Sequence, residues 1–250
     1  MFPVTSTDAI HGDFFTVSGA GFPDDTVVRF SQGGSTIDIT PDFVRPHLVY
    51  VESLPAIIPL GPNQLALVSG TGLSDAPPVN VQAGPLSTVC VLNPGAPKAD
   101  PYTIMFVANP AIEESAGVFS ADPVLTQRAA FQSVVTFSLH NLFDVRESLL
   151  RNGDIDAEFR LVCIFDDLAA TTDSNSLVSK YPPNLMLNRQ AAVRPYINGF
   201  GFEADMVFSI HGSASHNRAT ASMTSDDPAQ ASKAYAYDGM LHGHGHYAAI

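Results

Sequence analysis

The sequence contains no tryptophan, two cysteines and only 12 basic residues, and each shortage narrows what the chain can be. Against 25 acidic residues, the basic ones leave a formal net charge of −13. The basic stripe that binds a phosphate backbone is therefore missing, and an anionic membrane surface would repel the chain. No apolar run approaches the ~20 residues of a membrane span. We expect no nucleic-acid partner and no membrane insertion.

Cysteine is too scarce to build a disulfide framework. Cys90 and Cys163 lie in the apolar runs 87–92 and 159–165, which favours two buried thiols over a disulfide. The first residues lack the charged and apolar regions of a signal peptide. We expect an extracellular or cell-surface protein whose signal peptide is absent from this chain.

The composition is that of a folded protein with more than one domain. Hydrophobic residues make up 45% of the chain and charged residues 15%, which is ample material for a core. Domains commonly run ~100–150 residues, so 250 residues predict two of them. Proline and glycine cluster in residues 91–101, which we interpret as a linker between domains at 1–90 and 102–250.

The first domain is predicted to be an all-β sandwich. Short runs of β-branched and aromatic residues alternate with Gly, Pro, Asp and Asn clusters about every ten residues. The expected strands are residues 14–17, 26–30, 36–40, 48–51, 64–68 and 79–81.

The order of turns and strands in this first domain resembles a known family. The segments that carry the resemblance are 17–22 (Val-Ser-Gly-Ala-Gly-Phe), 27–30, 49–55 and 60–67. Together they resemble an immunoglobulin-like IPT/TIG domain. The resemblance implies a spacer or binding module and no catalytic residue.

The second domain is predicted to be an α/β fold with a mixed sheet. Apolar runs at 102–108, 158–165 and 204–210 indicate buried strands, and a helical pattern fills 122–150, with Asp122 as N-cap and Pro123 behind it. Residues 168–199 are interpreted as a long irregular connection. A last helix is expected to begin near Pro228 and to carry the histidines near the end of the sequence.

Those histidines are His242, His244 and His246. On a helix, His242 and His246 share one face at the spacing that suits one metal ion; on a strand, all three would share a face. Both structures could bind metal, and the flanking apolar residues favour the helix. We therefore predict a zinc site with His242 and His246 as ligands.

The pattern His242-x-x-Gly-His246 resembles the His-Glu-x-Gly-His helix of zincin metallopeptidases, and residues of about 100–250 resemble the IgA-peptidase-type branch. Gly243 stands where that family has its catalytic Glu, and a third ligand is not evident, although His211, His216 or Asp238 could serve. The resemblance implies a secreted or surface metallopeptidase-like protein that is catalytically impaired, or one piece of a longer peptidase, with a protein or glycoprotein as substrate or partner. No catalytic residue is assigned.

The alternative function is a non-enzymatic binding or assembly protein that uses the immunoglobulin-like module for interactions, with the histidine cluster incidental. Two further motifs have simple explanations. The pairs Asp166-Asp167 and Asp226-Asp227 are expected to cap elements, and residues 212–216 (Gly-Ser-Ala-Ser-His) do not form a nucleophile elbow.

Overall fold

The computed structural model describes residues 8–70, 72–95, 101–144, 158–182, 185–213, 218–219, 221–222, 234–235 and 247–249. The chain forms two compact units. Unit 1 comprises Met1–Tyr102 and Leu139–Val162, and unit 2 comprises Thr103–Ser138 and Cys163–Ile250. Both units are therefore discontinuous in sequence. The domain boundaries predicted at 1–90, 91–101 and 102–250 stay a prediction.

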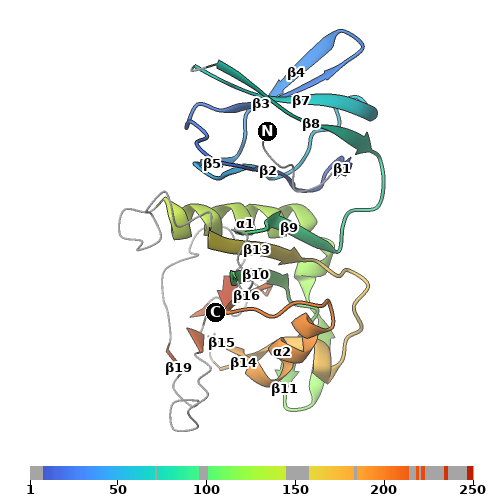
Figure 1. Cartoon of the computed structure of the whole chain (residues 1–250). Helices are drawn as coiled ribbons and strands as arrows, with labels where there is room; N and C mark the ends of the chain where they lie inside the picture. Colours follow the sequence, from blue (N-terminus) through green and yellow to red (C-terminus); the bar gives the residue numbers. More distant parts are fainter. Residues whose placement is uncertain are drawn as a thin grey trace. The chain divides into compact units, whose positions relative to one another are not determined.

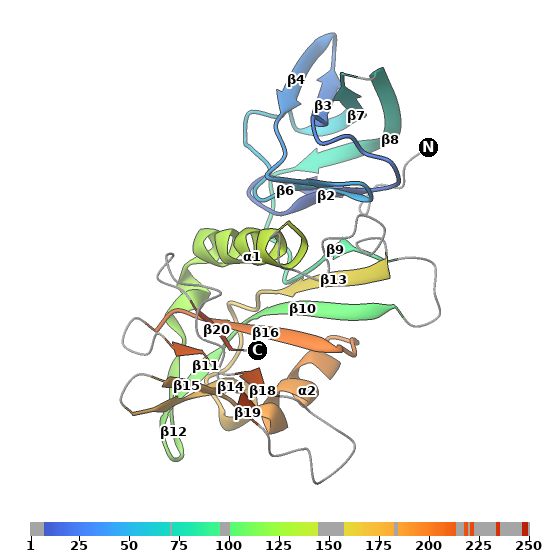
Figure 2. The same cartoon turned by 90° about the vertical axis from the view of Figure 1, so that its left-hand side faces the viewer.

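Unit 1 contains a sandwich of two sheets (Figure 2). The five-stranded sheet has the order β1 (Asp8–Ile10), β8 (Gly72–Gln82), β7 (Gly61–Ser69), β3 (Val27–Gln32), β4 (Ser35–Ile39). The three-stranded sheet has the order β2 (Phe15–Ser18), β6 (Leu48–Val51), β5 (Phe43–Arg45). β1 runs parallel to β8, and the pairs β7–β8, β3–β7, β3–β4, β2–β6 and β5–β6 are antiparallel.

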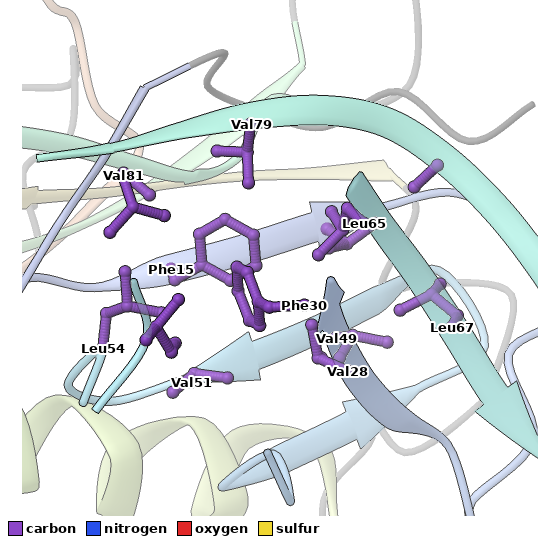
Figure 3. Packing of buried hydrophobic residues seen from close by; sticks show 14 of the residues in the cluster. Phe15, Val28, Phe30, Val49, Val51, Leu54, Leu65, Leu67, Val79 and Val81 are labelled. Atoms are coloured by element: carbon purple, nitrogen blue, oxygen red, sulfur yellow. The ribbon is translucent and has the colours of Figure 1, made fainter. Parts of the chain in front are cut away.

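The core of the sandwich follows from the alternation of side chains along each strand. In β3, Val28 and Phe30 are buried, whereas Arg29 between them points outward and pairs with Asp38 at 2.7 Å. Figure 3 shows Phe30 facing Phe15 of the opposite sheet. Their ring centroids are 5.4 Å apart. Residues of both sheets belong to one apolar cluster, so the two sheets enclose a single core.

Buried amide contacts join further elements to this sandwich within unit 1. Ser18 donates to Asn93 Oδ1 at 3.2 Å, and Asn93 Nδ2 donates to the Phe159 carbonyl at 2.9 Å. Asn93 ends β9 (Val89–Asn93), and Phe159 begins β13 (Phe159–Ile164). A separate, exposed contact lies at the end of helix α1 (Arg128–Phe143), where His140 and Asp144 hydrogen-bond to each other at 2.7 Å.

Unit 2 is built mainly of strands. One sheet has the order β12 (Val118–Ala121), β11 (Ala111–Ser115), β14 (Ser176–Tyr181), β15 (Leu185–Asn188), β17 (Arg218–Ala219). In another, β16 (Met206–His211) lies between β10 (Tyr102–Ala108), to which it is parallel, and β20 (Tyr247–Ala249), to which it is antiparallel. β10 and β16 run side by side in Figure 1. A short pair joins β18 (Ala221–Ser222) to β19 (Ala234–Tyr235).

The helical parts of unit 2 differ from the prediction in two places. Asp122 does cap a helix that starts at Pro123, but this is the short 3₁₀ helix η1 (Pro123–Thr126), and α1 begins only at Arg128. The expected irregular connection at 168–199 is instead the 3₁₀ helix η4 (Asp173–Asn175), strands β14 and β15, and helix α2 (Gln190–Asn198).

The predicted α/β domain with a histidine-bearing helix near the end of the sequence is wrong. Among the described residues of the whole chain, α1 and α2 are the two α-helices, and strands predominate. Ala234–Tyr235, expected within the last helix, is strand β19, and Tyr247–Ala249 is strand β20. Hydrogen bonding to the edge of β16 satisfies the backbone of this alanine-rich segment, so tertiary pairing overrides the helix propensity of alanine.

Candidate functional site

The predicted metal ligands His242 and His246, together with Gly243, lie outside the described residues. Of the possible third ligands, His216 and Asp238 also lie outside them, and His211 is fully buried at the end of β16. Within the part of the chain that the structure describes, no group of three or more His, Cys, Asp or Glu residues could hold a metal ion. The zinc site at His242 and His246 stays a prediction.

The resemblance to zincin metallopeptidases is nevertheless wrong as an account of this domain. It required a helix that continues through the residues after His246, and Tyr247 instead pairs with His211 as part of a β-ladder. The described residues show neither a metal-binding group nor a zincin helix. A peptidase or hydrolase is therefore not the interpretation that the structure favours.

Unit 2 contains a buried polar junction around Asp122. Asp122 Oδ1 accepts from the Val124 amide at 2.9 Å and from the Gly212 amide at 2.8 Å, and its Oδ2 accepts from Asn109 Nδ2 at 2.7 Å. Asn109 Oδ1 in turn accepts from the Leu177 amide at 2.9 Å. The two side chains thereby tie the ends of β10 and β16 to the starts of η1 and β14.

Burial dominates the electrostatics of this junction. It raises the pKa of Asp122 to about 6, against the opposing effect of the hydrogen bonds from Val124, Asn109 and Gly212 and of the charge on Lys180. Because folding raises the pKa of Asp122, the protonated carboxyl stabilises the folded state. This contribution to the free energy of unfolding is complete below the ordinary pKa of 3.8. That contribution is lost as the pH rises through about 6.

The junction is closely packed, which argues for a structural role. A Cβ on Gly212 would lie 2.7 Å from the Val124 nitrogen and 3.1 Å from Pro123. Asn109 is fully buried and Asp122 is 2% exposed. Beside them, the Ser213 amide donates to His211 Nδ1 at 3.3 Å, so the neutral ring in this geometry carries its proton on Nε2. Ser213 contacts the ring through its backbone amide in this bond, which is not the geometry of an activated nucleophile.

The sequence predicts that the acidic pair Asp166-Asp167 caps an element, whereas Asp166 instead hydrogen-bonds within a turn that follows β13. Asp166 Oδ1 accepts from the Leu168 amide at 3.2 Å, and the Asp166 carbonyl accepts from the Ala169 amide at 3.3 Å. The second pair, Asp226-Asp227, lies outside the described residues. Hydrogen bonds within its own turn account for Asp166.

Unit 1 offers a different kind of site, a loop that displays apolar side chains to solvent. Residues 55–60 form the second part of the connection from β6 to β7, and we call them the apolar loop. Ile57 is 70% exposed and Leu60 is 54% exposed, whereas Ile58 between them is buried in the core. Scattered exposed apolar residues are common, but two on one short loop are of interest because such surfaces mark interaction sites.

Hydrogen bonds hold the middle of the apolar loop against the sandwich. His11 Nε2 faces the Ile58 carbonyl at 2.9 Å, which requires the proton on Nε2. The Ile58 amide donates to the Pro55 carbonyl at 3.2 Å, closing a turn. The buried side chain of Ile58 anchors the same turn, so Ile57 is held outward.

The end of the apolar loop is held in the same way. Gln32 Nε2 donates to the Leu60 carbonyl at 3.1 Å and to the Pro62 carbonyl at 2.9 Å. Asn63, which is fully buried, donates through Nδ2 to the Pro59 carbonyl at 2.9 Å. The loop is therefore preorganised, and its carbonyl groups at positions 58, 59 and 60 already accept hydrogen bonds.

The apolar loop stands out in the sequence, but its pattern does not show which of its side chains are exposed. Residues 54–60 read Leu-Pro-Ala-Ile-Ile-Pro-Leu, an apolar run bracketed by prolines between two expected strands. Turns between strands are usually polar, so an apolar one predicts either burial or an interaction surface. Only the structure shows that Ile58 takes the first role and Ile57 the second.

Comparisons with known proteins do not assign the chain to a family. No family model and no curated protein matches the chain, so the suggested IPT/TIG membership is wrong by this measure, although the two-sheet sandwich is present. One similar solved structure is the Bacteroides ovatus mixed-linkage glucan utilization locus protein SGBP-B in complex with a mixed-linkage heptasaccharide. Sequence identity is 15% and the TM-score 0.25, and the match covers 48% of this chain and 26% of that chain. A likeness this slight carries no functional argument.

The expected extracellular or surface location stays a prediction. Among the described residues, no helix has the length and apolarity needed to cross a membrane.

Proposed function

We propose that this chain is a non-enzymatic binding or assembly protein and that unit 1 contacts a protein partner through the apolar loop. The observation that supports the proposal is the rigid display of Ile57 and Leu60, which are 70% and 54% exposed on a hydrogen-bonded loop. A preorganised surface loses little conformational freedom on binding, so more of its burial energy appears as affinity.

The chemistry of the loop favours an apolar protein surface as the partner. The carbonyl groups of Ile58, Pro59 and Leu60 are engaged by His11, Asn63 and Gln32, so the loop offers mainly its side chains. A glycan would need free donors and acceptors to pair its hydroxyl groups. The net charge of −13 opposes an anionic membrane surface.

The binding free energy expected from burying Ile57 and Leu60 is large enough to measure. Fully burying an aliphatic side chain contributes about 1.5–3 kcal/mol, and Ile57 and Leu60 expose over half of theirs, so burying both contributes about 2–4 kcal/mol. Replacing both by serine should therefore raise the Kd for the partner by at least about 30-fold.

The test begins with a benzoylphenylalanine photocrosslinker at position 57, used on extracts of the source cells, and the captured protein is then purified for affinity measurement. The variant Ile57→Ser/Leu60→Ser is compared with Leu168→Ser, which removes an 89% exposed leucine from unit 2. We expect the loop variant to weaken binding and the control to bind like the parent protein. Equal crosslinking from positions 57 and 168, or an unchanged Kd for the loop variant, would refute the proposal.

A further inference from the structure

The hydrogen bonds of Asp122 in unit 2 fit an ionised carboxylate. Its Oδ1 accepts from the amides of Val124 and Gly212, and its Oδ2 accepts from Asn109 Nδ2. Asn109 also accepts, through Oδ1, from the Leu177 amide at 2.9 Å. A carboxylate can only accept, whereas a protonated carboxyl must also donate. A proton added to Asp122 would therefore point at a group that is itself a donor.

One of the three donors can become an acceptor. Val124 and Gly212 donate through backbone amides, which have no acceptor to offer in exchange. Asn109 donates through a carboxamide, which presents its oxygen in place of its NH₂ after a half turn about the last side-chain bond. A proton on Asp122 Oδ2 is thus accommodated when the Asn109 carboxamide reverses and accepts it.

This reversal has a consequence on the other side of Asn109. The NH₂ group would then face the Leu177 amide, and two donors cannot hydrogen-bond to each other. Leu177 is fully buried, so water does not readily replace the lost acceptor. Because Asn109 follows β10 and Leu177 lies near the start of β14, the reversal releases one strand from the end of the other.

The driving force for the reversal is the cost of burying a charge. Burial raises the pKa of Asp122 from 3.8 to about 6, against the opposing effect of its hydrogen bonds. Because the pKa is raised, the protonated form becomes populated as the pH falls through about 6. Protonation removes the buried charge, and the loss of the Leu177 hydrogen bond is the opposing cost.

Few other titratable groups face Asp122. Lys180 of β14 favours the ionised carboxylate and is itself paired with Glu114 of β11 at 2.6 Å. On β16, His211 precedes Gly212, and its Nδ1 accepts from a backbone amide. β10 and η1 contribute no carboxyl group, histidine or basic residue. Asp122 is therefore the titratable group that acts directly on Asn109.

We propose that Asp122 and Asn109 form a pH-sensitive switch, in which protonation of Asp122 reverses the Asn109 carboxamide and frees the Leu177 amide. At neutral pH the switch ties β14 to the end of β10. In mild acid that tie is broken, while the hydrogen bonds from Val124 and Gly212 remain. The switch lies in unit 2 and does not depend on the function proposed for the apolar loop of unit 1.

The test is an NMR titration of the full chain between about pH 7.5 and about pH 5, on either side of the pKa of about 6. The ¹³Cγ shift of Asp122 reports its protonation, and hydrogen exchange gives protection factors for single amides. We expect the protection factor of Leu177 to fall at least about fivefold with the midpoint of Asp122, the factor given by loss of one ordinary hydrogen bond.

Two other amides serve as internal controls. The Arg189 amide donates to the Leu177 carbonyl at 2.8 Å and does not involve Asn109. The Gly212 amide donates to Asp122 Oδ1, which keeps a lone pair for it after protonation. Both protection factors should stay within about twofold. An equal fall at all three amides would show that the unit opens as a whole and would overturn the proposal.

Variants assign the effect to the pair. Asp122→Asn is neutral at every pH, so its Leu177 amide should be poorly protected at both ends of the titration and should show no step. The exchange Asn109→Asp/Asp122→Asn returns an acceptor to Leu177 and should restore its protection at about pH 7.5. The parent titration decides the question even if Asp122→Asn does not fold. Unchanged Leu177 protection on protonation of Asp122 would refute the switch, and an undiminished acid step in Asp122→Asn would assign the effect to another group such as His211.

Discussion

The substitution Asn109→Asp should make the stability of unit 2 steeply dependent on pH. In the structure, Asn109 Nδ2 donates to Asp122 Oδ2 at 2.7 Å inside a buried junction. The variant brings two carboxylate oxygens to that separation, and like charges so close cannot both ionise. The folded variant must therefore bind one proton that the unfolded chain releases.

The magnitude follows from that proton. An unfolded aspartate has a pKa of about 3.9, so holding one proton at pH 7 costs about 4 kcal/mol, partly offset by the hydrogen bond that the new acid donates. We expect a loss of about 3–4 kcal/mol at pH 7 relative to the parent protein. Between about pH 7 and 8, above the pKa of about 6 of Asp122 in the parent protein, the loss should grow by about 1.4 kcal/mol per pH unit, because there only the folded variant binds the extra proton.

The matched control is the exchange Asn109→Asp/Asp122→Asn, which swaps the two side chains of the junction. The carboxamide now at position 122 accepts from the Val124 and Gly212 amides through its carbonyl oxygen. Its amino group donates to the carboxylate now at position 109, which still accepts from the Leu177 amide. Every hydrogen bond of the junction has a partner and one negative charge remains. The exchange should recover all but about 1 kcal/mol of the stability and should remove the added pH slope.

The assay is urea unfolding followed by circular dichroism at several pH values, with hydrogen exchange of the Leu177 and Gly212 amides as a local measure. The reasoning is refuted if Asn109→Asp shows the same pH dependence as the parent protein. A double variant as unstable as the sum of the two single variants would also refute it, because the two side chains would then not act as a pair.

Two further predictions concern unit 2 and the histidines. Gly212→Ala should destabilise the protein by about 1–3 kcal/mol, because its Cβ would lie 2.7 Å from the Val124 nitrogen, whereas Gly84→Ala, with no atom within 4 Å, should change little in the same urea titration. Equal effects of the two substitutions would count against the close packing at Gly212. The predicted zinc site should bind the ion weakly in calorimetry at neutral pH, with affinity lost in His242→Ala and in His246→Ala, since two ligands leave the ion half hydrated. Unchanged affinity in both variants would show that these residues are not the ligands.

Local sequence determined the strands of the sandwich and one helix start. The alternation of Val28, Arg29 and Phe30 places one face of β3 in the core, because side chains on a strand point to opposite sides. Asp122 before Pro123 gave the capped start of η1, since both residues act on the first turn through short-range bonds. The sequence also favoured two buried thiols over a disulfide, and both cysteines are thiols in the structure, with Cys163 buried and Cys90 half-buried.

Tertiary structure decided what the local pattern left open. Tyr247–Ala249 reads as a helix end and is a strand, because the edge of β16 supplies partners for its backbone. The Asn109–Asp122 pair joins residues 13 positions apart to amides 68 and 90 positions away, a distance over which periodicity carries no information. Which face of the run at 54–60 meets solvent was likewise fixed only when His11, Gln32 and Asn63 came together around it. The structures of both the junction and the apolar loop therefore depend on residues that are close in space but distant in sequence.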